Sequence, residues 1–177
     1  GSQLAGWLSH RDTVCDIYDL PESDVTSDEF WAGFDLVRYS SILFFSGLTG
    51  ASASNANREK FTSVNEGGLK RLIERIRHLG TSAPKIIFPS TRLVYKGRDF
   101  PLQEDADKET KTVYAENKLN CERMLEQSGL PYAVVRICVP YGNVITHDYS
   151  YGTIGFMLKQ AKDGRITLFG DGSIRRT

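Results

Sequence analysis

The sequence predicts an α/β fold in which helices cover both faces of a parallel β-sheet, the doubly wound arrangement. Segments with strand and helix patterns alternate along most of the chain. The predicted strands are continuous apolar runs, which suits parallel strands buried on both faces better than half-exposed hairpins. With 177 residues, the chain is long enough for one domain with a hydrophobic core.

Five segments have apolar residues at helical spacing. They are residues 3–10, 27–34, 65–80, 114–129 and 153–164. Ser27 is the expected N-cap of the second segment, and Gly80 and Gly129 are the expected stops of the third and fourth.

Five other segments have the composition of strands. They are residues 12–19, 42–45, 83–91, 131–142 and 166–172. Small or polar residues stand at the ends of these strands, with Ser46 and Gly47 after the second and Ser90 and Thr91 closing the third. Because the carboxyl ends of parallel strands meet at one edge of a sheet, we expect a ligand site there.

The composition argues against several classes of protein. The 22 basic and 22 acidic residues balance, which argues against nucleic acid or an anionic membrane as a partner. No apolar run approaches the roughly 18 residues that span a membrane, and no signal peptide is visible. Cys15, Cys121 and Cys138 are widely spaced, so we expect reduced thiols in a cytoplasmic protein. The scattered histidines predict no metal site.

Tyr114 and Lys118 stand four residues apart at the start of a predicted helix, so they share one face. A free tyrosine has a pKa near ~10 and is a poor base at neutral pH. An ammonium one turn away favours the tyrosinate, so we expect Lys118 to lower the pKa of Tyr114. A hydroxyl of Ser90 or Thr91 could then hold the substrate oxygen while Tyr114 exchanges a proton with it. Taken alone, the pair also fits an ordinary solvated helix face.

Six motifs in order make the chain resemble the extended short-chain dehydrogenase/reductase family, which includes nucleotide-sugar epimerases, dehydratases and reductases. The matching segments are ILFFSGL, VNEGGLKRLI, FPSTRLVYKG, YAENK, RICVPYG and LFGDGSIRRT. The resemblance implies a Rossmann-like NAD(P)-binding domain over residues 1–177, with a substrate-binding region that starts at about residue 143. It also implies that Thr91, Tyr114 and Lys118 are the catalytic residues.

The resemblance assigns two sets of binding residues. The set expected to bind NAD, or NADP, is Asp19, Asp24, Val25, Phe45, Ser46, Gly47, Asn65 and Lys118. The set expected to bind substrate is Ser90, Thr91, Tyr141 and Arg176. Asp19 favours NAD, because a carboxylate accepts from the ribose 2′-hydroxyl and repels a 2′-phosphate. Asn65 could instead merely cap its helix.

The chain departs from the family pattern in several places. We expect it to be incomplete, without the first strand and its glycine-rich phosphate loop and without the C-terminal substrate domain; Gly1 is either the last glycine of that loop or the remnant of a cleaved tag. A helix and most of a strand are missing between Asp19 and Asp24. Arg92 and Leu93 follow Thr91 where the 4,6-dehydratases carry an acid pair, which argues against dehydration.

These features predict an NAD(P)-dependent enzyme that acts on a nucleotide-diphosphate sugar, with C4 epimerisation through a keto intermediate as the first choice. The alternatives are a 4-keto-sugar reductase and a non-catalytic, cofactor-sensing member of the fold. The helices with the most apolar faces, around Leu72 and Leu119, are expected to form a homodimer. These 177 residues alone are expected to be inactive, because most of the pyrophosphate's donors lie in the missing loop.

Overall fold

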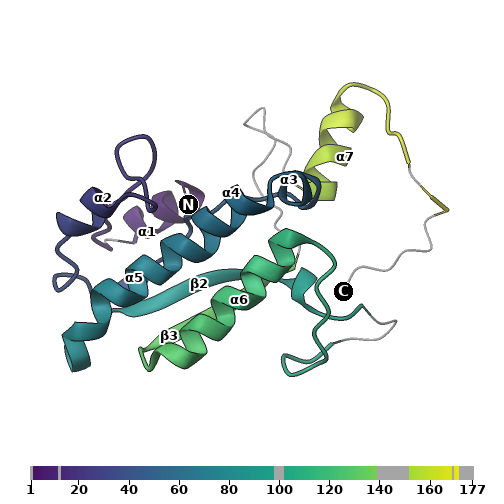
Figure 1. Cartoon of the computed structure of the whole chain (residues 1–177). Helices are drawn as coiled ribbons and strands as arrows, with labels where there is room; N and C mark the ends of the chain where they lie inside the picture. The colour runs from purple at the N-terminus through teal and green to yellow at the C-terminus, as the bar shows by residue number, and fades with distance from the viewer. Residues whose placement is uncertain (1, 12, 98–101, 139–151, 169, 172–177) are drawn as a thin grey trace.

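A parallel three-stranded sheet forms the centre of the molecule (Figure 1). The structure is a computed structural model that describes residues 2–11, 13–97, 102–138, 152–168 and 170–171. The strands are β1 (Ser41–Leu43), β2 (Lys85–Thr91) and β3 (Tyr132–Ile137), in the order β1-β2-β3. Ile42 pairs with Ile86, and Ser90 pairs with Arg136, both in parallel register. The three central predicted strands are therefore confirmed where the structure describes them.

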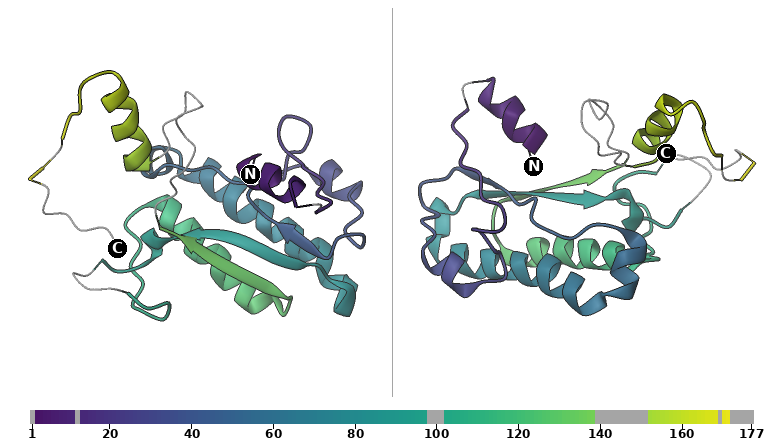
Figure 2. Two further views of the ribbon diagram at one scale, coloured as in Figure 1. Left: turned by 180° about the vertical axis from the view of Figure 1, so that it is seen from behind. Right: turned by 90° about the horizontal axis from the view of Figure 1, so that it is seen from above.

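Helices α5 (Gly68–Ile76) and α6 (Val113–Ser128) cover one face of the sheet, as the right-hand view of Figure 2 shows. Fully buried apolar side chains fill the space between these helices and the sheet: Leu69, Leu72, Ile76, Ile86, Phe88, Cys121 and Leu125. Burying one such aliphatic or aromatic side chain contributes about 1.5–3 kcal/mol. This layer is the hydrophobic core.

The apolar faces of the helices around Leu72 and Leu119, on which the dimer prediction depends, are buried within the domain. Leu72 is 0% exposed and Leu119 is 8% exposed. These faces therefore pack within the domain, and they are not available to a second copy. The reason given for a homodimer is wrong, because the sheet covers the apolar faces.

Short helical segments flank α5. They are α3 (Ala51–Ala56), α4 (Arg58–Thr62) and the π-helical turn η1 (Ser63–Gly67) before it, and the 3-10 helix η2 (Arg77–Ser82) after it. Gly80 has φ 55° within η2, and Gly129 has φ 73° directly after α6. Glycine adopts such left-handed conformations at little steric cost, so both predicted helix stops are confirmed.

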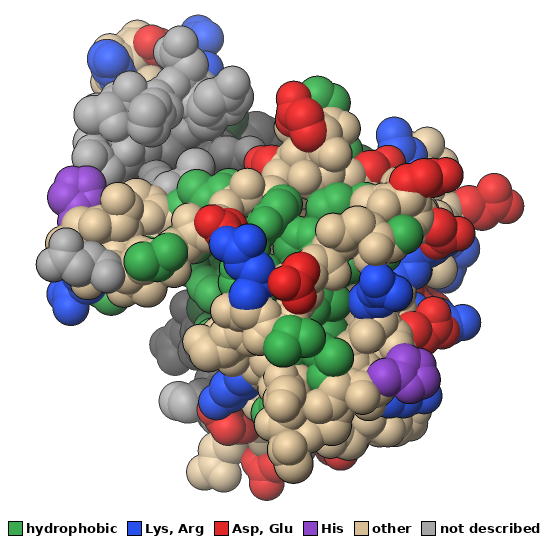
Figure 3. Space-filling model, turned by 90° about the vertical axis from the view of Figure 1, so that its left-hand side faces the viewer, with side chains coloured by type: hydrophobic (Ala, Val, Ile, Leu, Met, Phe, Trp, Pro, Cys, Tyr) green, Lys and Arg blue, Asp and Glu red, His purple; other side chains and the backbone are tan. Residues whose placement is uncertain are grey.

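The N-terminal region contains two short helices and, among its described residues, no strand. These are α1 (Ser2–Ser9) and α2 (Asp28–Ala32), and the Ser27 hydroxyl caps α2 by accepting from Phe30 N at 3.2 Å. The strand predicted at 12–19 is wrong, because residues 13–19 are irregular and Val14 is 97% exposed. A strand needs a neighbour for its backbone hydrogen bonds, and no described strand pairs with these residues. Figure 3 views the side where α2 lies in Figure 1 and shows hydrophobic surface in the middle of that face, with charged side chains around it.

The opposite face of the sheet is only partly covered. Figure 2 shows α1 and α7 (Gly152–Lys162) on that side, so helices lie on both sides of the sheet. Val135 and Ile137 of β3 nevertheless remain 51% and 37% exposed. Among the described residues, the closely packed face of the sheet is the one under α5 and α6.

The end of the described chain agrees with one prediction and contradicts another. Helix α7 matches the helix predicted at 153–164. The strand predicted at 166–172 is wrong over residues 166–168, which are irregular, with Leu168 72% exposed. No helix in the described part of the chain has the length and apolar character needed to cross a membrane.

Candidate active site

Thr91 lies at the carboxyl end of β2, where the strand passes into the 3-10 turn η3 (Arg92–Val94). Its side chain is buried, and its Oγ1 accepts a hydrogen bond from Leu93 N at 3.3 Å. The hydroxyl therefore caps the turn that follows the strand. This places Thr91 at the edge of the sheet where parallel folds carry their ligand sites.

Tyr114 lies in the first turn of α6. The Thr112 side chain starts this helix by accepting from Ala115 N at 3.2 Å. Tyr114 N donates to Ser54 Oγ at 3.0 Å, so the helix start is also tied to α3. Val113 N donates to Asn55 Oδ1 at 3.0 Å as well, so the position of the tyrosine depends on one local cap and two contacts distant in sequence.

Lys118 lies one turn further along α6 and is 6% exposed. Its Nζ donates to the Pro89 carbonyl oxygen at 2.8 Å and lies 4.5 Å from the centre of the Phe88 ring. The same atom is 6.0 Å from the centre of the Tyr114 ring. The lysine thus joins the helix of Tyr114 to the strand that ends in Thr91.

Burial shifts the pKa of both Tyr114 and Lys118. Desolvation penalises the charged form of each group, so it raises the pKa of the Tyr114 phenol and lowers the pKa of the Lys118 ammonium. The prediction that Lys118 lowers the pKa of Tyr114 is therefore wrong for this arrangement. The lysine donates to the Pro89 carbonyl, and the effect of burial on the phenol prevails.

Asn65 fixes the loop that follows β1. It lies in η1 and is 3% exposed. Its Oδ1 accepts from Leu48 N at 2.7 Å, and its Nδ2 donates to Leu48 O at 3.1 Å. Gly47 has φ +156°, and a Cβ there would lie 2.9 Å from Asn65 Oδ1, so the close approach needs glycine. Asn65 holds this loop and makes no side-chain cap of its own helix.

Phe45, Ser46 and Gly47 continue the chain beyond β1, on the same edge of the sheet as Thr91. Phe44 N donates to Ile87 O at 3.0 Å, so the chain stays beside β2 up to this point. Phe45 is 39% exposed and Ser46 is half-buried. Because β1 and β2 are parallel, the structure brings these predicted cofactor contacts to the strand ends that also carry Thr91.

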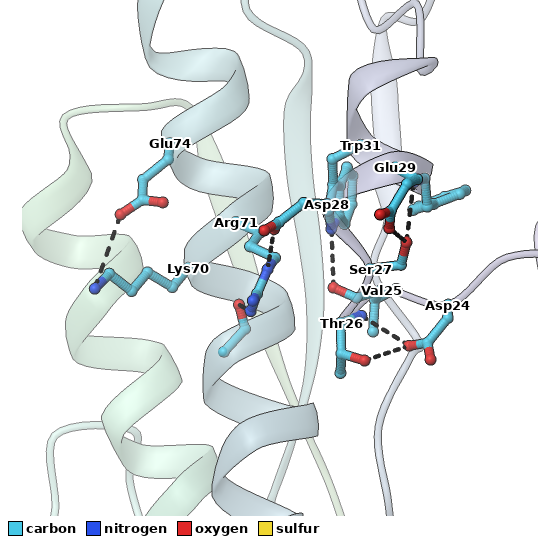
Figure 4. Close-up of polar contacts among 12 residues, drawn as sticks. Asp24, Val25, Thr26, Ser27, Asp28, Glu29, Trp31, Lys70, Arg71 and Glu74 are labelled. Atoms are coloured by element: carbon cyan, nitrogen blue, oxygen red, sulfur yellow. Dashed lines mark hydrogen bonds and ion pairs between the residues drawn. The ribbon is translucent and has the colours of Figure 1, made fainter.

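Asp24 and Val25 form a turn beside the start of α5 (Figure 4). The exposed Asp24 carboxylate accepts from Thr26 N and from Thr26 Oγ1, both at 2.8 Å, and these bonds hold its pKa below the usual value. Val25 packs on Gly68, where an added Cβ would lie 2.8 Å from Val25 Cγ2. The two residues therefore line the amino end of α5.

Asp19 is placed differently from the prediction. It is exposed in a turn, and its Oδ1 accepts from Leu20 N at 2.9 Å. Because residues 13–19 form no strand, Asp19 does not stand at a strand end. The described residues therefore do not build the expected ribose contact around Asp19.

Ser90 and Thr91 point to opposite faces of β2, because neighbouring side chains alternate along a strand. Ser90 is 3% exposed, and its Oγ donates to the Glu122 carboxylate of α6. This is the face covered by helices, so Ser90 is not placed as the predicted substrate contact. The predicted substrate contacts Tyr141 and Arg176 lie outside the described residues.

The sequence prediction missed a polar cluster beside the site. Arg136 of β3 donates from Nη2 to Glu122 Oε2 and from Nη1 to the Tyr95 hydroxyl, each at 2.7 Å. The three residues line a cavity of about 1300 Å³ between α6, β3 and the segment after η3. Two signals were present in the sequence, an arginine inside an apolar strand and a glutamate four residues after Lys118.

The residues present fit part of the NAD that the resemblance implies. An ammonium has three N–H donors, and Lys118 uses one on Pro89, so it can also serve ribose hydroxyls. Gly47 leaves the loop after β1 without a side chain where it approaches the strand ends. The exposed Asp24 carboxylate offers an acceptor. These groups suit the ribose and ring portions of a dinucleotide.

Comparison with known proteins agrees with this arrangement. The sequence matches the NAD dependent epimerase/dehydratase family over residues 8–177. A UDP-glucose 4-epimerase of Streptomyces lividans is 26% identical over 144 residues, which cover 75% of this chain and 43% of that protein.

Two solved structures share the fold. The UDP-glucose 4-epimerase of Thermotoga maritima, solved with UDP-glucose, has a TM-score of 0.80 at 21% identity, over 97% of this chain and 63% of that chain. The UDP-glucose 4-epimerase of Brucella ovis, solved with NAD, has a TM-score of 0.69 at 21% identity, over 82% of this chain and 50% of that chain. The chain spans about half the length of the relatives it matches.

The family match covers nearly the whole chain, and the parallel sheet with its flanking helices agrees with a Rossmann-like fold. The resemblance to the extended short-chain dehydrogenases/reductases is thereby confirmed. The chain belongs to the NAD dependent epimerase/dehydratase family.

Proposed function

We propose that the protein is an NAD-dependent enzyme that epimerises a nucleotide-diphosphate sugar at C4 through a keto intermediate. The observation that carries this proposal is the 2.8 Å hydrogen bond from Lys118 Nζ to Pro89 O, which joins the helix of Tyr114 to the strand of Thr91. The family membership and the similarity to UDP-glucose 4-epimerases support it.

The side chains divide the proton chemistry between them. The phenolic oxygen of Tyr114 would take the proton of the sugar C4 hydroxyl as C4 gives up its hydride, and would return the proton to the same oxygen as a hydride is added to the other face of the planar keto carbon. Thr91 Oγ1 holds that oxygen by a hydrogen bond. The Lys118 ammonium binds ribose hydroxyls and fixes the helix to the strand. NAD, when bound, supplies the hydride acceptor and donor.

The raised pKa of Tyr114 sets the pH dependence of the two half-reactions. Near neutral pH the phenol is protonated, which is the form that gives a proton to a keto oxygen. Removal of the hydroxyl proton needs the tyrosinate, whose fraction increases as the pH rises toward the pKa. The oxidation step should therefore become faster with rising pH, while the protonation step should become slower.

Arg92 and Leu93 favour epimerisation over 4,6-dehydration. They form the start of η3 directly after Thr91, and both line the large cavity. A guanidinium stays protonated and a leucine has no ionisable group, so neither moves protons at neutral pH. Dehydration of a sugar at C5 and C6 needs such an acid–base pair.

A homodimer and a cytoplasmic location remain proposals. A dimer formed through these helices would use their exposed faces, which carry Lys70 and Glu74 on α5 and Glu116 on α6. Light scattering of the full-length protein measures its mass, and a monomer would contradict the dimer. Fractionation of cells tests the location.

The function is tested by incubating full-length protein and NAD with a panel of UDP- and dTDP-sugars and separating the products. Interconversion of C4 epimers is the expected result. A 4-keto-6-deoxy product would show a dehydratase. Conversion of 4-keto sugars and of no other sugar, in the presence of reduced cofactor, would show a reductase. Protein that binds NAD but converts no sugar would contradict the enzyme assignment and favour the cofactor-sensing alternative.

A further inference from the structure

Glu122, which is buried, and Arg136, which is half-buried, form an ion pair behind the strand end that carries Thr91. Their side chains are 8% and 20% exposed. Arg136 Nε donates to Glu122 Oε1 at 3.0 Å, and Arg136 Nη2 donates to Glu122 Oε2 at 2.7 Å. This is the two-pronged geometry that only a guanidinium makes with a carboxylate, and it holds the pKa of Arg136 above its usual value.

The pair is the meeting point of segments that are separate in sequence. Glu122 on α6 also accepts from Ser90 Oγ, next to Thr91 at the end of β2. From β3, Arg136 Nη1 donates to the Tyr95 hydroxyl and to the Glu104 carbonyl oxygen, each at 2.7 Å. The ion pair therefore contacts the end of β2, the helix of Tyr114 and the segment that connects them.

This connecting segment has Thr91 before it and Tyr114 after it. Its described parts form a short arm, in which Tyr95 pairs with Lys108 and Lys96 N donates to Asp107 O at 2.8 Å. Glu109 N donates to Val94 O at 3.0 Å and closes the base of the arm. Arg136 fixes both sides of the arm to the sheet, through Tyr95 on one side and Glu104 on the other.

We propose that Glu122 and Arg136 are positioning residues that set the distance between Thr91 and Tyr114, an inference that rests on the proposed function. Neither touches the reacting atoms. Desolvation offsets much of the attraction within an ion pair that is largely withdrawn from water, so the effect of this pair is to fix geometry. Reacting groups lose about 100-fold in rate when they are misplaced by 1 Å, which makes such a restraint important for turnover.

The test compares Glu122→Gln, Arg136→Lys and Arg136→Met in the full-length protein. Glu122→Gln and Arg136→Lys keep size or charge but lose the two-pronged pair, and kcat per NAD-binding site should fall about 10- to 100-fold while the Kd for NAD stays within about twofold. The kcat per NAD-binding site should fall further in Arg136→Met than in Arg136→Lys, because methionine has neither the charge nor a donor. A purely structural role would reduce activity and NAD-binding capacity in proportion, and an unchanged kcat per binding site would overturn the proposal.

Glu116→Gln is the matched control. It lies on the same helix and removes an ion pair with Arg58, but its side chain is 43% exposed and it contacts neither Ser90 nor the arm. It should leave kcat unchanged.

A second readout keeps this inference separate from the proposed function. Hydrogen exchange at Leu93 N, which donates to Thr91 Oγ1, should be faster in Glu122→Gln than in Glu116→Gln. If the wild type converts no nucleotide sugar, the proposed function fails, and the exchange at Leu93 still decides whether the pair holds the strand end. Equal exchange in the two variants would overturn the positioning role.

Discussion

The N-terminal residues 13–40 and the sheet with α5 and α6 both contain apolar segments, yet they differ in how those segments are covered. In the first region Val14 and Ile17 are 97% and 68% exposed. In the second, Ile86 lies on the central strand between β1 and β3 and is fully buried. The difference indicates that an apolar run becomes a strand where a neighbouring strand takes its backbone hydrogen bonds, and that helices then bury the face they cover.

The N-terminal region is held by different contacts. Its aromatic side chains cluster edge to face or stacked: Tyr18, Phe30, Trp31, Phe34 and Tyr39. Trp31 Nε1 donates to Val25 O at 2.8 Å, and Asp28 pairs with Arg71 of α5 at 2.9 Å (Figure 4). The Trp31 bond holds the region internally, the Asp28 ion pair attaches it to α5, and the buried side chains of Trp31 and Leu36 join the core under the helices.

The largest contrast is expected between Ile86→Ala and Ile17→Ala, the same change in the two regions. Ile86 is 0% exposed in the core, so its truncation should lower the free energy of unfolding by about 2–5 kcal/mol. Ile17 is 68% exposed, so its truncation should change the free energy of unfolding by no more than about 0.5 kcal/mol. Urea unfolding of the full-length variants measures both free energies. Similar losses in the two variants would contradict the exposure of Ile17.

Gly47→Ala and Gly33→Ala compare glycines in the two regions. At Gly47 a Cβ would lie 2.9 Å from Asn65 Oδ1 with φ at +156°, so the variant should be destabilised by about 1–3 kcal/mol. At Gly33 the φ is −86° and the nearest atom, Glu29 O, is 3.9 Å from the added Cβ. Gly33→Ala should therefore unfold like the wild type. Equal stability of the two variants would show that Asn65 does not hold the loop after β1.

Cys121→Ala and Cys15→Ala compare a core thiol with an exposed one. Burial raises the pKa of Cys121 from 9.0 to about 12. The folded protein then keeps a proton that the unfolded chain loses, so this contribution to stability is present below pH 9 and lost as the pH rises toward 12. Between pH 9.5 and 10.5 the wild type should lose about 1.4 kcal/mol more than Cys121→Ala. Urea unfolding at the two pH values measures the difference, and Cys15→Ala should follow the wild type. A Cys121→Ala variant with the slope of the wild type would contradict the burial of this thiol.

The smallest effect is expected at the exposed ion pair between the regions. Asp28 is 87% exposed in its ion pair with Arg71. An exposed pair contributes about 1 kcal/mol or less, so Asp28→Asn should lower the thermal midpoint only slightly, and the difference should vanish at high salt. A large loss would mean that the two regions depend on each other more than the contacts indicate.

The sequence was sufficient for elements whose signals are local. The spacing of apolar residues, together with Gly80 and Gly129, predicts the helices at 65–80 and 114–129, and the structure confirms them. The strand predicted at 12–19 is wrong. Its apolar residues resemble those of β1, but whether a segment forms a strand depends on a pairing partner elsewhere in the chain. β1 succeeds because β2 lies beside it.

The places of Thr91, Tyr114 and Lys118 at a strand end and a helix start could be predicted from the sequence, but the pKa shifts of the tyrosine and the lysine could not. The order of Thr91, Tyr114 and Lys118 follows from motifs, and strand alternation would have turned Ser90 away from Thr91. The raised pKa of Tyr114 could not be foreseen, because burial depends on packing between distant segments. The Glu122–Arg136 pair joins a helix to a strand, and no sequence spacing specifies that contact.

Tyr114→Phe in the full-length protein tests most directly whether Tyr114 moves the proton of a sugar hydroxyl. The change removes only the hydroxyl, so C4 epimerisation should slow by about 100- to 10,000-fold. The Kd for NAD, measured by calorimetry, should stay within about twofold, because the proposed role of the phenol is proton transfer and not cofactor binding. Loss of turnover with intact NAD binding is the predicted result. A variant that epimerises as fast as the wild type would contradict the claim.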